Sequence, residues 1–290
     1  MKKYLLIIPL FMAVACDLVV DVDIPIEEQK LTLNSFFIQD SVWTAKLSLS
    51  RHILDEANFK TVDDGLVVIF EQGNPVDTLF SEGNGIYSAD SKPVPGRSYE
   101  IKVISPAHGS VRSRSYLPEA VAINNMEMEI PQDLSVDDPK ISIRFQLKDR
   151  AQETNYYQVL LTMERRYKNH FSGEEMIAHQ TVPLESNDPV IANTNDNNSE
   201  GFFFKDALFD GKEISLSLKA PYWGAGNEGM KLIFYLRTLS EDFYKYKITS
   251  RLRNSTSGDP FAQPVNVYTN VENGFGIFGG FSQSVFVYQK

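Results

Sequence analysis

The sequence has 290 residues, 42% of them hydrophobic and 23% charged, which is the composition of a folded protein long enough for two domains. Its 38 acidic residues outnumber the 28 basic ones, and no basic stripe offsets this excess, so nucleic acid is not an expected partner. The 13 tyrosines and 19 phenylalanines favour strands over helices.

The chain begins with MKKYLLIIPLFMAVAC, which has the pattern of a secretory leader. Lys2 and Lys3 form a basic start, and the apolar run from Tyr4 to Val14 is too short to span a bilayer, which takes about 20 residues. Small residues then precede Cys16 as in a bacterial lipobox, although Ala13 stands where leucine is usual. The sequence therefore predicts a signal peptide over residues 1–15.

Cys16 is the only cysteine in the chain, so no second thiol exists for a disulfide bridge. We expect Cys16 to be lipidated and residues 16–28 to form an acidic tether. Without the leader, the chain has 26 basic and 38 acidic residues. The later apolar stretches have the length of strands, which predicts a protein anchored to a membrane and not spanning it.

From residue 29 the pattern has period two, as in strands with one buried and one wet face. It is clearest in residues 31–34, 47–50 and 99–103. Short strands separated by turn signals favour an antiparallel sandwich, and we assign it to residues 29–118. The turn signals are Asp63-Asp64-Gly65, Gly73-Asn74-Pro75, Gly83-Asn84-Gly85 and Pro95-Gly96.

Residues 119–290 are expected to form a second, β-rich domain. Alternation predicts strands at residues 141–147, 156–167, 214–218 and 232–236. One helix is expected in this half of the chain, with Ser240 as N-cap, acidic residues in its first turn and an end before Gly258.

The stretch NGFGIFGG, residues 273–280, spells the dinucleotide fingerprint G-x-G-x-x-G. Residues 265–269 could be the strand that such a motif needs, but residues 281–288 form a second strand pattern, and no room remains for the crossover helix. The glycines are therefore expected to allow positive φ or close backbone approach around a tight β turn. We expect no cofactor.

Residues 259–282, DPFAQPVNVYTNVENGFGIFGGFS, resemble the C-terminal signature of the DUF4249 family. The resemblance extends to the acidic segment after Cys16, to VPGRSYEIKV (residues 94–103) and to the helix near Ser240. It implies an outer-membrane lipoprotein with an N-terminal immunoglobulin- or prealbumin-like sandwich and a β-rich second domain. It also implies a gene found beside TonB-dependent transporters, and no catalytic residue.

Two constellations could suggest metal sites. His170 and His179, with Glu174 and Glu175, match no zinc spacing, and an exposed hairpin tip is the simpler explanation. Residues 193–200 carry side-chain oxygens at alternate positions, as calcium-binding loops do. The run has few carboxylates, however, and we expect it to be a solvated loop. We therefore expect no metal.

Two functions remain open. The first is a non-catalytic lipoprotein that captures a ligand or assists a TonB-dependent transporter, on an undetermined face of the outer membrane. The second is a cell-envelope hydrolase such as a glycosidase, whose two carboxylates would meet only in the fold. For binding, Tyr222 and Trp223 are the expected exposed contacts, whereas Trp43 fits the core equally well.

Overall fold

The computed structural model describes residues 28–52, 58–131, 138–168, 173–191, 200–222, 230–256 and 261–289. Within these residues the protein is mainly β with a single helix, as the sequence predicted. The elements in chain order are β1 (Leu31–Ile38), β2 (Thr44–Leu49), β3 (Leu66–Glu71), β4 (Asn74–Gly83), β5 (Ile86–Ser88), β6 (Arg97–Ser105), β7 (Gly109–Leu117), β8 (Asn124–Glu129), β9 (Lys140–Lys148), β10 (Tyr156–Lys168), β11 (Glu175–Val182), β12 (Phe202–Lys205), β13 (Glu213–Pro221), β14 (Lys231–Leu239), α1 (Glu241–Thr256) and β15 (Phe275–Gln289).

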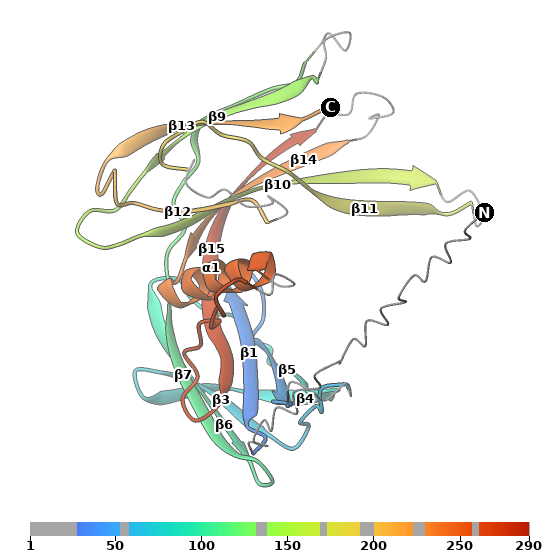
Figure 1. Ribbon diagram of the computed structural model, residues 1–290, viewed down its shortest axis with the longest axis vertical. Coiled ribbons are helices and arrows are strands. Elements are labelled where there is room, and N and C mark those ends of the chain that lie inside the picture. The colour runs from blue at the N-terminus through green and yellow to red at the C-terminus, as the bar shows by residue number, and fades with distance from the viewer. Residues whose placement is uncertain are drawn as a thin grey trace, which may run out of the picture.

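One sheet runs through the whole molecule in the order β11-β10-β14-β15-β1-β2-β5-β4-β3-β6-β7, and β12 also pairs with β10. A second sheet has the order β13-β9-β8. Figure 1 shows two lobes with α1 between them. The first lobe contains β1 to β7, the second contains β8 to β14, and β15 extends through both.

Each lobe has its own hydrophobic core, because its strands alternate buried and exposed side chains. In the first lobe Leu33, Phe37, Trp43 and Ile101 are buried, so Trp43 is a core residue. Rings of Phe37 and Trp43 lie 5.3 Å apart between centroids. Three of the four predicted turns are confirmed by glycines with positive φ, which glycine adopts at little cost: Gly73, Gly83, Gly85 and Gly96. At Asp63-Asp64-Gly65 the chain forms a bend, and Gly65 has no positive φ.

β15 joins the lobes by changing partners along its length. Its first half pairs with β1 in parallel, from Thr32 opposite Phe275 to Ile38 opposite Phe281. Its second half pairs with β14 antiparallel, ending at Lys231 opposite Gln289. The C-terminal strand thus joins the strands of both lobes into one sheet, which no local pattern in the sequence indicates.

The glycines of residues 273–280 allow close packing in this strand. Gly276 has φ +111°, and a Cβ there would overlap the carbonyl oxygen of Leu33 on β1. At Gly279 a Cβ would lie 3.0 Å from the backbone nitrogen of Phe243 in α1. The expected close backbone approach is confirmed, but both glycines lie within β15 and not in a tight turn. Residues 265–269, which could have been the strand of a dinucleotide motif, form no strand.

The segment before β15 packs against β7 and closes the first lobe. Its Glu272 N–H donates to the carbonyl oxygen of Arg112 (2.8 Å) in an isolated antiparallel bridge. Val271 and Phe278 are members of the first core, although they lie far beyond residue 118. Pro118, at the expected domain boundary, is itself buried. The division of the chain at that residue, like the immunoglobulin-like sandwich, stays a prediction.

The second lobe packs the β13-β9-β8 sheet against the other half of the large sheet. Ile141, Ile143, Phe145 and Leu147 alternate inward from β9, as predicted, and Phe145 lies 5.0 Å from Phe234 of β14 between ring centroids. Helix α1 begins where expected, with the Phe243 N–H donating to Ser240 Oγ (3.2 Å).

Candidate functional site

A groove of about 530 Å³ lies on the outer face of the first lobe, where β3, β6 and β7 are adjacent. Strand register places Phe70 opposite Glu100, and Glu100 opposite Arg114, so the three side chains form one row across the strands. The groove is lined by Phe70, Gln72, Gly73, Ser98, Tyr99, Glu100, Arg114, Ser115 and Tyr116. It therefore combines aromatic rings with amide, hydroxyl and charged groups, a composition suited to ligand binding.

Glu100 is the buried charge of this groove, with only 9% of its surface exposed. Its Oε1 lies 3.0 Å from Lys102 Nζ, and Arg114 Nε donates to its Oε2. Burial pushes the pKa of Glu100 upward, but the two cations outweigh burial and hold the pKa below its usual value. The carboxylate is ionised at neutral pH, which suits a binding group and not a general acid.

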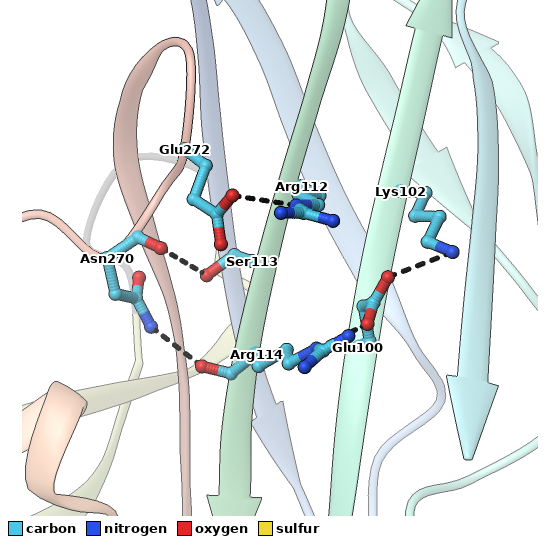
Figure 2. A network of polar contacts seen from close by, with 7 residues as sticks. All are labelled: Glu100, Lys102, Arg112, Ser113, Arg114, Asn270 and Glu272. Carbon is cyan, nitrogen blue, oxygen red and sulfur yellow. Dashed lines mark hydrogen bonds and ion pairs between the residues drawn. The ribbon is translucent and has the colours of Figure 1, made fainter. Parts of the chain in front are cut away.

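The C-terminal segment fixes the β7 wall of the groove (Figure 2). Arg112 Nε donates to Glu272 Oε2 (2.7 Å), and Ser113 Oγ donates to the carbonyl oxygen of Asn270 (2.9 Å). Asn270 Nδ2 donates to the carbonyl oxygen of Arg114 (3.2 Å). These contacts hold β7 from Arg112 to the carbonyl group of Arg114, whose own side chain is 74% exposed and available to a ligand.

Three aspartates meet at a second place, between the loops that follow β9 and β12. Carboxylate oxygens of Asp149, Asp206 and Asp210 all lie within 4.8 Å of one another, and the first two residues are buried. Such oxygens could hold a divalent cation. This cluster is not predictable from local sequence, because Asp149 and Asp206 lie 57 positions apart. The local signal is an aspartate directly after a strand in both loops.

The hydrogen bonds of the cluster show what its carboxylates do in the fold. Asp149 accepts from the Tyr157 hydroxyl through Oδ1 and from the Gly211 N–H through Oδ2 (2.8 Å). Asp206 Oδ2 accepts from the Asn155 N–H (2.6 Å). Burial, followed by the charges of neighbouring carboxylates, raises the pKa of Asp206. Asp149 thus joins the loops through its hydrogen bonds, whereas burial and the neighbouring carboxylates disfavour the ionised form of Asp206.

The structure corrects the expectation for Tyr222. Its side chain is buried in the second core, 7% exposed, in contact with a small cavity beside Met163 and Leu232, so it is not an exposed aromatic. Its N–H donates to the carbonyl oxygen of Pro139 (2.9 Å). Trp223 lies outside the described residues, so the expected contact at that position stays a prediction.

Several other predictions also fall on residues that the structure does not describe. These are the lipidation of Cys16, the tether up to residue 27, His170 and most of the Asn-rich run over residues 193–200. His179 is described and lies exposed on β11, on the hairpin expected from the sequence. Among the described residues, no helix is long and apolar enough to cross a membrane.

Taken together, the fold and the groove define a mainly β protein with a hydrophobic core in each lobe, a shared C-terminal strand and a polar–aromatic surface groove. The family model for a domain of unknown function, DUF4249, matches residues 18–286, and the chain belongs to that family. A search of curated proteins found no match to the chain.

Proposed function

We propose that this chain is a lipid-anchored, non-catalytic binding protein of the outer membrane that works beside a TonB-dependent transporter. The observation that carries the proposal is the groove at Glu100, whose buried carboxylate is neutralised by Lys102 and Arg114. A carboxylate held in this way cannot supply a proton at neutral pH, and it orients the exposed guanidinium of Arg114, which can donate hydrogen bonds to a ligand. The leader and Cys16 support the anchor, and the family resemblance supports the transporter.

The chemistry of the groove favours an uncharged, polyhydroxylated ligand such as a glycan. Among the residues that line the groove, the charges of Glu100 and Arg114 offset each other, and Lys102, the second cation beside Glu100, is not part of the lining. Gln72 and Ser98 add neutral hydrogen-bonding groups, and the rings of Phe70 and Tyr116 offer apolar faces. A ligand with hydroxyls and an apolar C–H face would satisfy both kinds of group.

Ligand binding is tested by titrating neutral oligosaccharides into the protein, beginning with any glycan that copurifies with the native lipoprotein. Arg114→Ala and Tyr116→Ala should each weaken binding by about tenfold, the loss of one good contact. Arg144→Ala is the matched control, because Arg144 forms a comparable exposed pair with Glu127 (2.7 Å) on the other sheet. Equal affinities for all variants would contradict the assignment of the groove.

The alternative is a hydrolase that uses Asp149 and Asp206. The observation in its favour is a buried carboxyl of raised pKa beside a second carboxylate, the arrangement of an acid and its partner. Against it, both oxygens of Asp149 already accept internal hydrogen bonds. Hydrolysis of an envelope glycan by the wild-type chain, lost in Asp206→Asn, would replace the binding proposal with this one.

A further inference from the structure

The β10–β11 hairpin extends beyond the body of the second lobe (Figure 1). Its strands pair from Leu161 opposite Val182 to Lys168 opposite Glu175. From Arg165 to the end of β10, and over the first six residues of β11, every residue is exposed. Both faces of this two-stranded ribbon are thus open, and such a ribbon is only marginally stable in water on its own.

The outer edge of β11 is also open, since β11 ends the strand order and pairs only with β10 in the described part of the chain. An open edge presents unpaired N–H and C=O groups to another strand. Natural edges are usually protected by proline or a bulge, but β11 contains no proline and its pairing with β10 shows no register shift. Met176 and Ile177 are 41% and 53% exposed on it.

We propose that β11 pairs antiparallel with β11 of a second copy of this chain, about a two-fold axis at Ile177. Residues directly opposite in an antiparallel pair share a face, so a two-fold axis perpendicular to the sheet must pass through a residue position. With the axis at Ile177, Glu175 lies opposite His179 of the second copy and Met176 lies opposite its Ala178.

The charges along this edge select the register. With the axis at Met176, Glu175 would face Ile177, and with the axis at Ala178, Ile177 would face His179. The axis at Ala178 would place Glu175 opposite the Thr181 hydroxyl, but it would also place Met176 opposite the polar Gln180. Only the axis at Ile177 combines a hydrogen-bond donor opposite the carboxylate with apolar residues opposite apolar ones. Apolar side chains then also face apolar side chains, so the strand is complementary to itself, as a two-fold interface requires.

The neighbouring strands extend this complementarity. Lys168 of β10 lies opposite Glu175, and Glu164 lies opposite His179. Pairing two copies therefore places Lys168, Glu175, His179 and Glu164 in one row across four strands, with the last two from the second copy. Each carboxylate in this row has a cation or a hydrogen-bond donor beside it.

Five directly opposed pairs form a small interface, well below the ~1,200 Å² of a standard stable complex. We therefore expect a weak, reversible dimer in solution. Two copies confined to one membrane surface would have a higher effective concentration and pair more fully. The dimer depends on the β10–β11 hairpin, so it can hold or fail independently of the groove.

Cysteine crosslinking tests the register directly. In the full chain carrying Cys16→Ser, no other thiol remains. Ile177→Cys would place two thiols opposite each other within disulfide range, so mild oxidation should yield a crosslinked dimer. Glu175→Cys or His179→Cys alone should not crosslink, because equivalent residues would lie four positions, about 13 Å, apart. A mixture of these two variants should crosslink to a heterodimer.

Sedimentation velocity on the chain without new cysteines supplies the second measurement. Ile177→Lys would oppose two ammonium groups at the axis, and dimerisation should weaken at least about tenfold. Ile104→Lys is the matched control, since Ile104 is 54% exposed on the first lobe and should leave dimerisation unchanged. Crosslinking of His179→Cys as strong as that of Ile177→Cys, or a wild-type chain that stays monomeric at every concentration, would overturn the proposal.

Discussion

Ser240 and Gly280 are joined by two hydrogen bonds at the point where β15 passes from one lobe to the other. The Ser240 N–H donates to the carbonyl oxygen of Gly280 (2.8 Å), and the Gly280 N–H donates to Ser240 Oγ (3.1 Å). The same hydroxyl oxygen caps α1 by accepting from Phe243. One side chain thus links the start of the helix to the strand that both lobes share.

Ser240→Ala should lower the free energy of unfolding by roughly 2–3 kcal/mol, since it removes a helix cap and leaves the buried Gly280 N–H without its acceptor. Urea denaturation followed by circular dichroism measures the change. Ser255→Ala removes a serine from the exposed last turn of the same helix and should change stability by less than about 0.5 kcal/mol. Equal losses in the two variants would contradict the linking role of Ser240.

Gly276→Ala should be severely destabilising, by roughly 3 kcal/mol or more, because a Cβ there overlaps the Leu33 carbonyl and φ is +111°. Gly73→Ala separates these two causes: Gly73 also has positive φ (+83°), but nothing lies within 4 Å of its Cβ position. We expect Gly73→Ala to cost only about 1 kcal/mol. Similar thermal unfolding temperatures for both variants would show that β1 and β15 do not pack as described.

The stability of the aspartate cluster should depend on pH. Burial, together with the charges of Asp149 and Asp210, raises the pKa of Asp206, so ionising this carboxyl costs folding free energy. The stabilisation from its protonated form is complete below the unfolded pKa of about 3.9 and is lost as pH rises through the folded value.

Asp206→Asn cannot ionise, so the variant should gain stability relative to wild type between pH 4 and pH 7. Urea unfolding of both proteins at the two pH values measures this difference. If the difference in unfolding free energy between the variant and wild type is the same at pH 4 and pH 7, or favours wild type more at pH 7, the pKa of Asp206 is not raised.

The anchor is tested by Cys16→Ser. If Cys16 is the lipidated residue, the substitution should abolish incorporation of labelled fatty acid and release the protein from the membrane fraction. Because the chain has no other cysteine, no second site can replace it. Labelling that persists in the variant would contradict the lipoprotein assignment.

Local patterns in the sequence predicted the local structure well. Alternation identified strands such as β9, and the Ser240 cap with its acidic first turn identified the start of α1. These features depend on residues a few positions apart, so a single sequence carries them. The parallel pairing of β1 with β15 joins residues about 240 positions apart, and no local periodicity in the sequence indicates it.

The candidate site was not predictable for the same reason. Phe70, Glu100 and Arg114 come from three strands and meet only through strand register. The prediction of exposure for Tyr222 was wrong because the neighbouring proline and glycine indicated a loop, whereas tertiary packing buries the ring in the second core. Turn residues report backbone shape and not the side of the sheet on which a side chain lies.

The most direct test of the proposed function is purification of the tagged protein from native membranes in mild detergent, followed by mass spectrometry of its partners. We predict recovery of a barrel-sized TonB-dependent transporter with the wild-type chain and with the Arg144→Ala control, at similar yield. Recovery of the protein alone in several detergents, together with measurable hydrolase activity, would contradict it.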